Sequence, residues 1–194
     1  TYLEFVLPGI LALSAMNNSF SPVSTSLNIS KLYTKTLEEV LVSPVSPWSV
    51  AFGKALTGLV RGVFSALTLL FVGWVSGVHL PLSLAFFAVL ALTAFCFGSM
   101  GVAAAMLAHT HEDMANFNSF FIIPMSFLAG TFFSPDRLPE PFSSLILVYP
   151  LTHASLLLRA LASGGEPAFG SVVILAAYTV MFFYLGGRLV KRAE

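Results

Sequence analysis

Long apolar stretches dominate the chain and alternate with shorter polar ones. A helix that crosses the hydrocarbon core of a bilayer needs about 20 mostly apolar residues. We therefore expect five membrane-spanning helices, at about Phe5–Leu27, Ala55–Ser76, Leu82–Ala108, Phe117–Phe133 and Phe169–Leu189. The pattern predicts an all-α fold, with residues 1–194 forming a single transmembrane helical bundle.

The first of these stretches is the most polar. Pro8, Asn17, Asn18 and several serines interrupt it. Polar side chains within a bilayer need partners, so this helix should face protein or a cavity along one side. An ordinary packed helix, whose asparagines bond to neighbouring backbone or helices, is the alternative.

The segment 134–167 is long, rich in proline and more than a simple loop. Leu145–Val148 and Ala154–Ala162 are apolar and helix-prone, but each is too short to span a bilayer. Pro139, Pro141 and Pro150 interrupt the chain around them. The sequence therefore predicts a broken, re-entrant helical hairpin that packs on the other helices.

The composition indicates a lipid environment. Hydrophobic residues make up 57% of the chain and charged residues 9%, whereas a soluble domain is about 25% charged. Nine basic residues balance nine acidic ones, without a basic block, which argues against a nucleic-acid surface. Cys96 is the only cysteine, so a disulfide or a thiolate zinc site within the chain is excluded.

The distribution of Lys and Arg predicts the orientation. With five spans, one side of the membrane collects seven basic residues, namely Lys31, Lys35, Lys54, Arg61 at the foot of a helix, Arg188, Lys191 and Arg192. The other side collects Arg137 and Arg159. The positive-inside rule places the seven in the cytoplasm, with the carboxyl end inside and the amino end outside. The chain opens at Thr1 without a signal peptide, so we expect a preceding helix and six spans in the intact protein.

The predicted cytoplasmic loop, residues 31–54, contains an amphipathic segment. In Lys35–Val42, Leu37, Val40 and Leu41 share one helical face, and Lys35, Glu38 and Glu39 share the other. Pro44 and Pro47 follow and should end the helix. Such a helix can dock on a soluble partner through its apolar face, or it can rest on lipid headgroups.

Motifs that would carry chemistry are weak. The chain has no phosphate-binding loop, so an ATP-driven process would need an ATPase on another chain. His109, His111, Glu112 and Asp113 match no known metal-site spacing, and Asp113 fits a first-turn acid of the next helix. His153 lies beside Thr152 without a nucleophile motif, and a capping or interfacial role suits it better.

Small residues recur in the second and third predicted spans, at Gly53, Gly58 and Gly62 and at Gly98, Gly101 and Ala103–Ala105. Small residues allow helices to approach closely in lipid. They predict tight helix packing and offer a possible dimer face.

Three stretches resemble the permeases of type-2 ATP-binding-cassette (ABC) exporters. YLEFVLPGILALSAM is similar to the family's second membrane helix, and YTKTLEEVLVSPVSPWSVAFGK to its cytoplasmic coupling region, where a Gly-Lys opens the next span. AGTFFSPDRLPEPFSSLILVYPLTHASLLLRAL is similar to the signature before the last helix, here Gly130, Phe132, Phe133, Pro135, Leu138, Pro139, Pro150, Leu151, Thr152 and Arg159. The family's leading segment and first helix are absent, and the nearest subgroup is the nodulation-type lipooligosaccharide and drug exporters.

The resemblance implies a permease of the bacterial inner membrane that forms a homodimer or a close heterodimer above two ATPase subunits. ATP and magnesium would bind to those subunits, and this chain would hold no cofactor, metal or catalytic residue. A coupling helix would comprise Lys35, Leu37, Glu38, Glu39, Val40 and Leu41. Asn17 and Asn18 would line the substrate pathway, with Pro139, Pro150 and Arg159 at an outer gate. The expected function is alternating-access export of a lipid-linked glycan, a lipid or a hydrophobic drug.

Two other classes of function stay open. An intramembrane lipid-modifying enzyme or protease could use His153 or the His109–Asp113 cluster. A membrane scaffold without transport activity would need neither.

Overall fold

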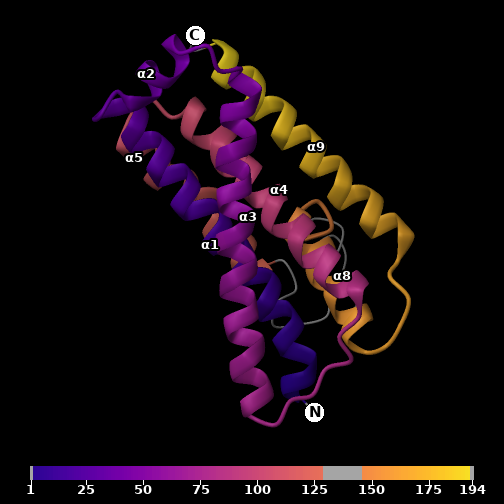
Figure 1. The fold of residues 1–194 in the computed structure, drawn as a ribbon. Coiled ribbons are helices and arrows are strands. Elements are labelled where there is room, and N and C mark those ends of the chain that lie inside the picture. Colours follow the sequence, from indigo (N-terminus) through magenta and orange to yellow (C-terminus); the bar gives the residue numbers. More distant parts are fainter. Residues whose placement is uncertain (1, 129–145, 193–194) are drawn as a thin grey trace.

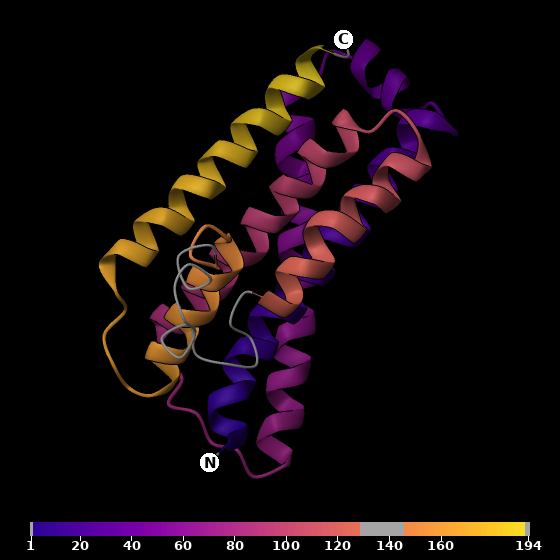
Figure 2. The ribbon, with the colours of Figure 1, turned by 180° about the vertical axis from the view of Figure 1, so that it is seen from behind.

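The computed structural model describes residues 2–128 and 146–192, which fold into helices and turns without a strand in either range (Figure 1). The helices are α1 (Tyr2–Leu32), α2 (Thr36–Val42), α3 (Pro47–Val75), α4 (Leu84–Leu107), α5 (His111–Phe117), η1 (Asn118–Ile122), α6 (Ile123–Leu128), α8 (Pro150–Ala162) and α9 (Phe169–Arg192). A π-helical turn, η1, joins α5 to α6 without a break (Figure 2). The predicted all-α fold is confirmed for the described residues.

Three of the described helices, α3, α4 and α9, are long and apolar enough to cross a membrane. At 31 residues α1 is also long enough, but its Asn and Ser residues make it more polar. The fourth predicted stretch falls on α5, η1 and α6, and its last residues lie outside the described ranges. Five spans, and a sixth upstream, remain predictions.

The central helix is α4. It packs against α1, α3, α8 and α9, and sixteen of its residues are buried. A helix that is apolar on all sides suits either lipid or a protein interior, and α4 occupies the interior. The other long helices pack around it, as the two opposite views show (Figures 1 and 2).

Successive long helices run in opposite directions, so their connections alternate between two ends of the bundle (Figure 1). One end carries α2, the α4–α5 turn and the carboxyl end of the chain; we call it the basic end. Lys31, Lys35, Lys54, Arg188, Lys191 and Arg192 belong to it. The opposite end carries the start of α1 and the turn 77–81 (Figure 2).

Glycines set the spacing between α3 and α4. A Cβ atom added at Gly98 would lie 2.8 Å from the carbonyl oxygen of Ala55, and one at Gly58 would lie 2.9 Å from the Cα of Gly98. Gly62 and Gly101 lie equally close to α1 backbone. The predicted close packing is therefore confirmed, but these four glycines face helices of their own chain and are not available as a dimer face.

The second span begins earlier than predicted, and this moves Arg61. Ser46 precedes the helix and Pro47 occupies its first position, where a proline's missing N–H costs nothing. Gly53–Lys54 therefore lies inside α3 and does not open it. Arg61 lies fourteen residues after Pro47 and fourteen before Val75, at the middle of α3, so its placement at the foot of a helix is wrong.

A buried short helix lies before the last span. Thirteen residues long, α8 starts at Pro150 and packs against α1, α4 and α9. The Thr152 hydroxyl donates to the Ile146 carbonyl oxygen at 2.7 Å. This agrees with the predicted packing of the hairpin on other helices. Pro139, Pro141 and Leu145 lie outside the described residues.

Candidate functional site

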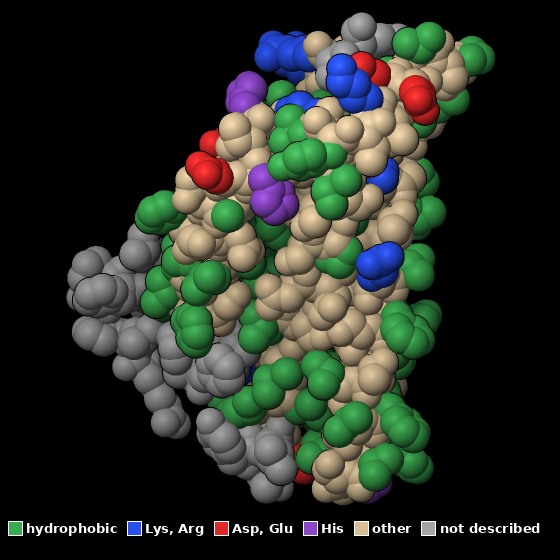
Figure 3. Space-filling view, turned by 90° about the vertical axis from the view of Figure 1, so that its left-hand side faces the viewer, with side chains coloured by type: hydrophobic (Ala, Val, Ile, Leu, Met, Phe, Trp, Pro, Cys, Tyr) green, Lys and Arg blue, Asp and Glu red, His purple; other side chains and the backbone are tan. Residues whose placement is uncertain are grey.

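The exposed side of α1 carries a polar stripe. Ser14, Asn18, Ser21 and Thr25 follow one another at intervals of three or four residues, so they lie on one helical face. Asn18, Ser21 and Thr25 are exposed and Ser14 is half-buried. Figure 3 shows this side of the molecule, where a non-hydrophobic band runs lengthwise between hydrophobic borders.

A groove lies along one edge of the stripe, between α1 and α3. Its lining combines polar and apolar side chains: Asn18, Pro22, Arg61, Phe64, Ser65, Thr68 and Leu69. The Ser14 and Ser65 hydroxyls are 2.8 Å apart and bond the two helices. Asn18 Nδ2 donates to the Ser14 carbonyl oxygen at 3.0 Å. We call this the α1–α3 groove; its volume is about 470 Å³.

A second groove follows the other edge of the stripe, between α1 and α5. Ser21, Ser24, Thr25, His111 and Asn118 contribute its polar lining.

At the buried end of α1, near this second groove, the Asn28 Oδ1 atom lies 3.3 Å from His111 Nδ1. The Nδ2 atom of Asn28 is buried without a hydrogen-bond partner among the described residues. The polar grooves on both sides of α1 make this surface poorly suited to contact with lipid.

The short helix α2 projects at the basic end (Figure 1). Leu37 and Leu41 are only 5% and 8% exposed, because both pack into the hydrophobic core of the chain. They therefore point inward, not outward as expected. Val40 is 40% exposed, and Glu38 and Glu39 lie on the surface. The surface that α2 can offer to another protein thus combines the carboxylates of Glu38 and Glu39 with the exposed side chains of Val40 and Val42.

A backbone irregularity fixes the start of α2. Lys35, just before the helix, has φ 54°, in the left-handed region that side-chain-bearing residues rarely occupy. Ser43 ends the helix, and its hydroxyl donates to the Val40 carbonyl oxygen. The left-handed conformation of Lys35 turns the chain between α1 and α2, and the two helices contact each other.

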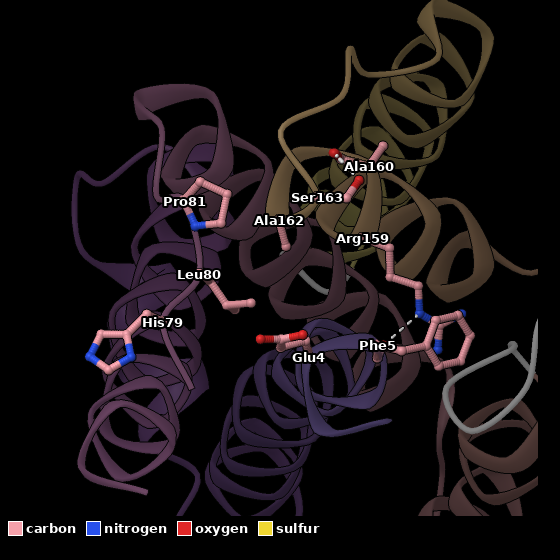
Figure 4. Close-up of a pocket in the computed structure, with 9 residues that line it drawn as sticks. All are labelled: Glu4, Phe5, His79, Leu80, Pro81, Arg159, Ala160, Ala162 and Ser163. Carbon is pink, nitrogen blue, oxygen red and sulfur yellow. Dashed lines mark hydrogen bonds between the residues drawn. The ribbon is translucent and has the colours of Figure 1, made fainter. Parts of the chain in front are cut away.

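A pocket of about 600 Å³ opens at the end opposite α2. Glu4 and Phe5 of α1, the turn His79–Pro81 and the last turn of α8 with Arg159 line it (Figure 4). The Arg159 guanidinium lies 4.1 Å above the Phe5 ring, and its Nε donates to the Phe5 carbonyl oxygen at 3.2 Å. Arg159 thereby ties α8 to the start of α1.

His153 is a structural residue. It is 4% exposed, and its Nε2 lies 2.8 Å from the Leu147 carbonyl oxygen and its Nδ1 3.2 Å from the Ser171 hydroxyl. A carbonyl only accepts, so Nε2 must donate and Nδ1 accepts from the serine. Both ring nitrogens thus join α8 to its neighbours, a structural role of the kind that the sequence favoured for His153.

The His109–Asp113 turn is a helix cap. The Asp113 carboxylate accepts from the backbone N–H groups of His109 and Thr110, each at 2.9 Å, and the Thr110 hydroxyl accepts from the Asp113 N–H. This reciprocal capping box starts α5, as the prediction of a first-turn acid required. The two backbone hydrogen bonds lower the pKa of Asp113. Within the described residues, no three His, Cys, Asp or Glu side chains come together in a metal-binding arrangement.

The predicted pathway and gate residues lie in separate places. Asn18 is on the stripe and Asn17 is half-buried beside it. Pro150 and Arg159 lie at the two ends of α8, and Pro139 is outside the described residues. Sequence reasoning missed Arg61 and Ser65 as pathway candidates. The sequence could have indicated Arg61, because it is the only charged residue in the predicted second span.

Comparison with known proteins identifies the family. The profile described as ABC-2 type transporter matches residues 1–162. The inner membrane transport permease YadH of Escherichia coli (strain K12) is 28% identical over 202 residues, which cover this whole chain and 77% of YadH. Nodulation protein J of Rhizobium meliloti (strain 1021) is 28% identical over 203 residues, covering 99% of this chain and 74% of that protein. The chain belongs to the ABC-2 type transporter family.

Proposed function

We propose that this chain is the membrane permease subunit of an ATP-driven exporter in a bacterial inner membrane, and that it moves an amphipathic substrate by alternating access. The observation that carries the proposal is the polar stripe of α1 with its two grooves. A polar surface of this length is costly against lipid, so it needs a water-filled pathway or a second permease chain beside it. The relatives are described as a transport permease and a nodulation protein, and family membership supports a transport role for this chain.

The energy for transport would come from a separate ABC ATPase subunit that contacts α2. The chain itself has no phosphate-binding loop. Because Leu37 and Leu41 anchor α2 on its own chain, a push on the exposed residues Glu38, Glu39 and Val40 would pass into α1, which α2 contacts. The exposed carboxylates of Glu38 and Glu39 would pair with basic groups on the ATPase, and this pairing would favour fast and oriented docking.

The outer end would be controlled by α8. Its contacts with α1 through Arg159, and with α9 through His153, allow it to follow both helices when they tilt. A homodimer, or a close heterodimer, would place two such stripes around one pathway. The basic end would then face the cytoplasm, following the positive-inside rule.

Two pairs of substitutions in the full-length protein test the coupling role. Glu38→Lys with Glu39→Lys should reduce co-purification of the ATPase and lower substrate-stimulated ATP hydrolysis, while the amount of permease in the membrane stays unchanged. Leu37→Ala with Leu41→Ala should lower the abundance and stability of the permease itself, because truncating two buried leucines costs about 2–5 kcal/mol each.

The matched control is Glu166→Lys, a charge reversal at an exposed position of the opposite end. Undiminished ATPase binding and activity in the Glu38→Lys, Glu39→Lys permease would refute α2 as the coupling element.

A further inference from the structure

Arg61 is a charged residue in an unusual position. It lies at the midpoint of α3, a helix long and apolar enough to cross a membrane. Lys54, on the same helix, is seven residues closer to the basic end, so Arg61 lies about 10 Å deeper. A guanidinium at that depth costs about 3 kcal/mol or more unless it has a counter-charge or water.

The described residues offer Arg61 no anion. The guanidinium is exposed and makes no hydrogen bond or ion pair within residues 2–128 and 146–192. In α1, α3, α4 and α9 the only acidic residue is Glu4, in the first turn of α1. Along α1 Glu4 is fourteen residues from Asn18, which lines the groove of Arg61, and this corresponds to about 21 Å. A second copy of the chain, placed against this face, would have the same lack of acids in these helices.

The α1–α3 groove around Arg61 suits an amphiphile. Asn18, Ser65 and Thr68 supply polar atoms, and Pro22, Phe64 and Leu69 supply apolar surface beside them. Thr68 donates its hydroxyl hydrogen to the Phe64 carbonyl oxygen, and Asn18 donates to α1 backbone. The five N–H groups of the guanidinium are thus the main donors left to a ligand, and their fork matches the two oxygens of a phosphate, sulfate or carboxylate.

We infer that the α1–α3 groove binds the anionic headgroup of an amphiphile through Arg61, with the apolar part of the ligand lying against Pro22, Phe64 and Leu69. This inference rests on the proposed transport function and narrows its substrate class to anionic amphiphiles. A cationic drug would place like charges together beside Arg61. The same headgroup chemistry is also present in anionic phospholipid, so the test separates the two sources.

The probe is dodecyl phosphate, with dodecyl trimethylammonium as the cationic match. Binding is measured on the purified full-length permease in phosphatidylcholine nanodiscs, for wild type, Arg61→Gln, Arg61→Lys and Arg188→Gln. Loss of a charge-assisted hydrogen bond should raise the dissociation constant of Arg61→Gln roughly ten- to hundredfold. Arg61→Lys should show a smaller rise, because lysine keeps the charge without the bidentate fork. Arg188, exposed near the end of α9, serves as the control and should show no change.

Equal dodecyl phosphate affinity in wild type and Arg61→Gln, or equal affinity of wild type for the cationic probe, would overturn the inference. If Arg61→Gln does not insert into the membrane, the dissociation constants of Arg61→Lys and wild type are compared instead, and equal values would overturn the inference. Adding phosphatidylglycerol to the nanodisc identifies the source of the anionic headgroup. If phosphatidylglycerol competes with dodecyl phosphate, the groove binds bilayer lipid; if it does not compete, the groove binds a transported amphiphile. Since the ATPase is not needed, failure here is distinct from failure of the coupling test.

Discussion

Replacing Gly98 with alanine tests the tight contact between α3 and α4. The new methyl group would lie 2.8 Å from the Ala55 carbonyl oxygen and 3.4 Å from the Cα of Gly58. Both neighbours are backbone atoms, so no side-chain rotation relieves the contact, and the helices must move apart by about half an ångström. We expect an overpacking cost of about 1–3 kcal/mol, offset by up to about 1 kcal/mol because alanine favours a helix over glycine.

Gly53→Ala is the matched control on α3. A Cβ atom at Gly53 meets nothing within 4 Å, so only the helix preference acts, and this variant should gain up to about 1 kcal/mol. The two variants change the same residue type by the same methyl group, yet should move stability in opposite directions. Reversible unfolding in mixed micelles with added sodium dodecyl sulfate, followed by tryptophan fluorescence, measures both. A Gly98→Ala protein as stable as Gly53→Ala would refute the packing argument.

Three further predictions concern the two ends of the bundle. Lys31→Met should destabilise the protein by about 1 kcal/mol, because Lys31 Nζ donates to two carbonyl oxygens at the end of α4, each at 2.8 Å; the same unfolding assay checks it, and wild-type stability would contradict it. The folded state lowers the pKa of Asp113. The stability that this cap gives to α5 should therefore be complete at pH values above the ordinary carboxyl pKa, and it should be lost as the pH falls through the lowered pKa. The protection of first-turn amides of α5 against hydrogen exchange, relative to the exchange rate of an unstructured chain at the same pH, should therefore fall in acid for wild type but not for Asp113→Asn. Identical pH profiles of this protection would refute the cap. In a Cys96→Ala background, an impermeant thiol reagent should label Glu166→Cys but not Ser46→Cys in intact cells, and the reverse pattern would invert the orientation.

The positions of the long helices could be predicted because an apolar run long enough to cross a bilayer rarely forms any structure other than a membrane helix. Their boundaries could not, and α3 shows why. Residues 47–54 are moderately polar, yet Ser46 and Pro47 start the helix there. Moving the start by eight residues, from Ala55 to Pro47, turns Arg61 from an end residue into a central one.

The amphipathic pattern of α2 was also only partly informative. Periodicity identifies an apolar face, but it does not say what that face meets. Leu37 and Leu41 turn back into their own chain, a tertiary contact that no local pattern encodes. For the same reason the glycines of α3 and α4 could be recognised as packing residues, but not assigned to an internal contact.

The α1–α3 groove depends on residues far apart in the sequence. The hydroxyls of Ser14 and Ser65 meet across 51 positions, and neither residue is distinctive alone. The two asparagines could be singled out because asparagine is rare in an apolar run, whereas serine and threonine are common in membrane helices and bond to their own backbone.

The measurement that tests the central claim most directly is transport in inverted inner-membrane vesicles. The full-length permease is co-expressed with its ABC ATPase subunit, and a fluorescent anionic lipid is added outside. Our account predicts ATP-dependent accumulation of that lipid inside the vesicles, and its loss when Glu38→Lys is combined with Glu39→Lys. Accumulation that is independent of ATP, or that survives those substitutions at the wild-type rate, would contradict the account.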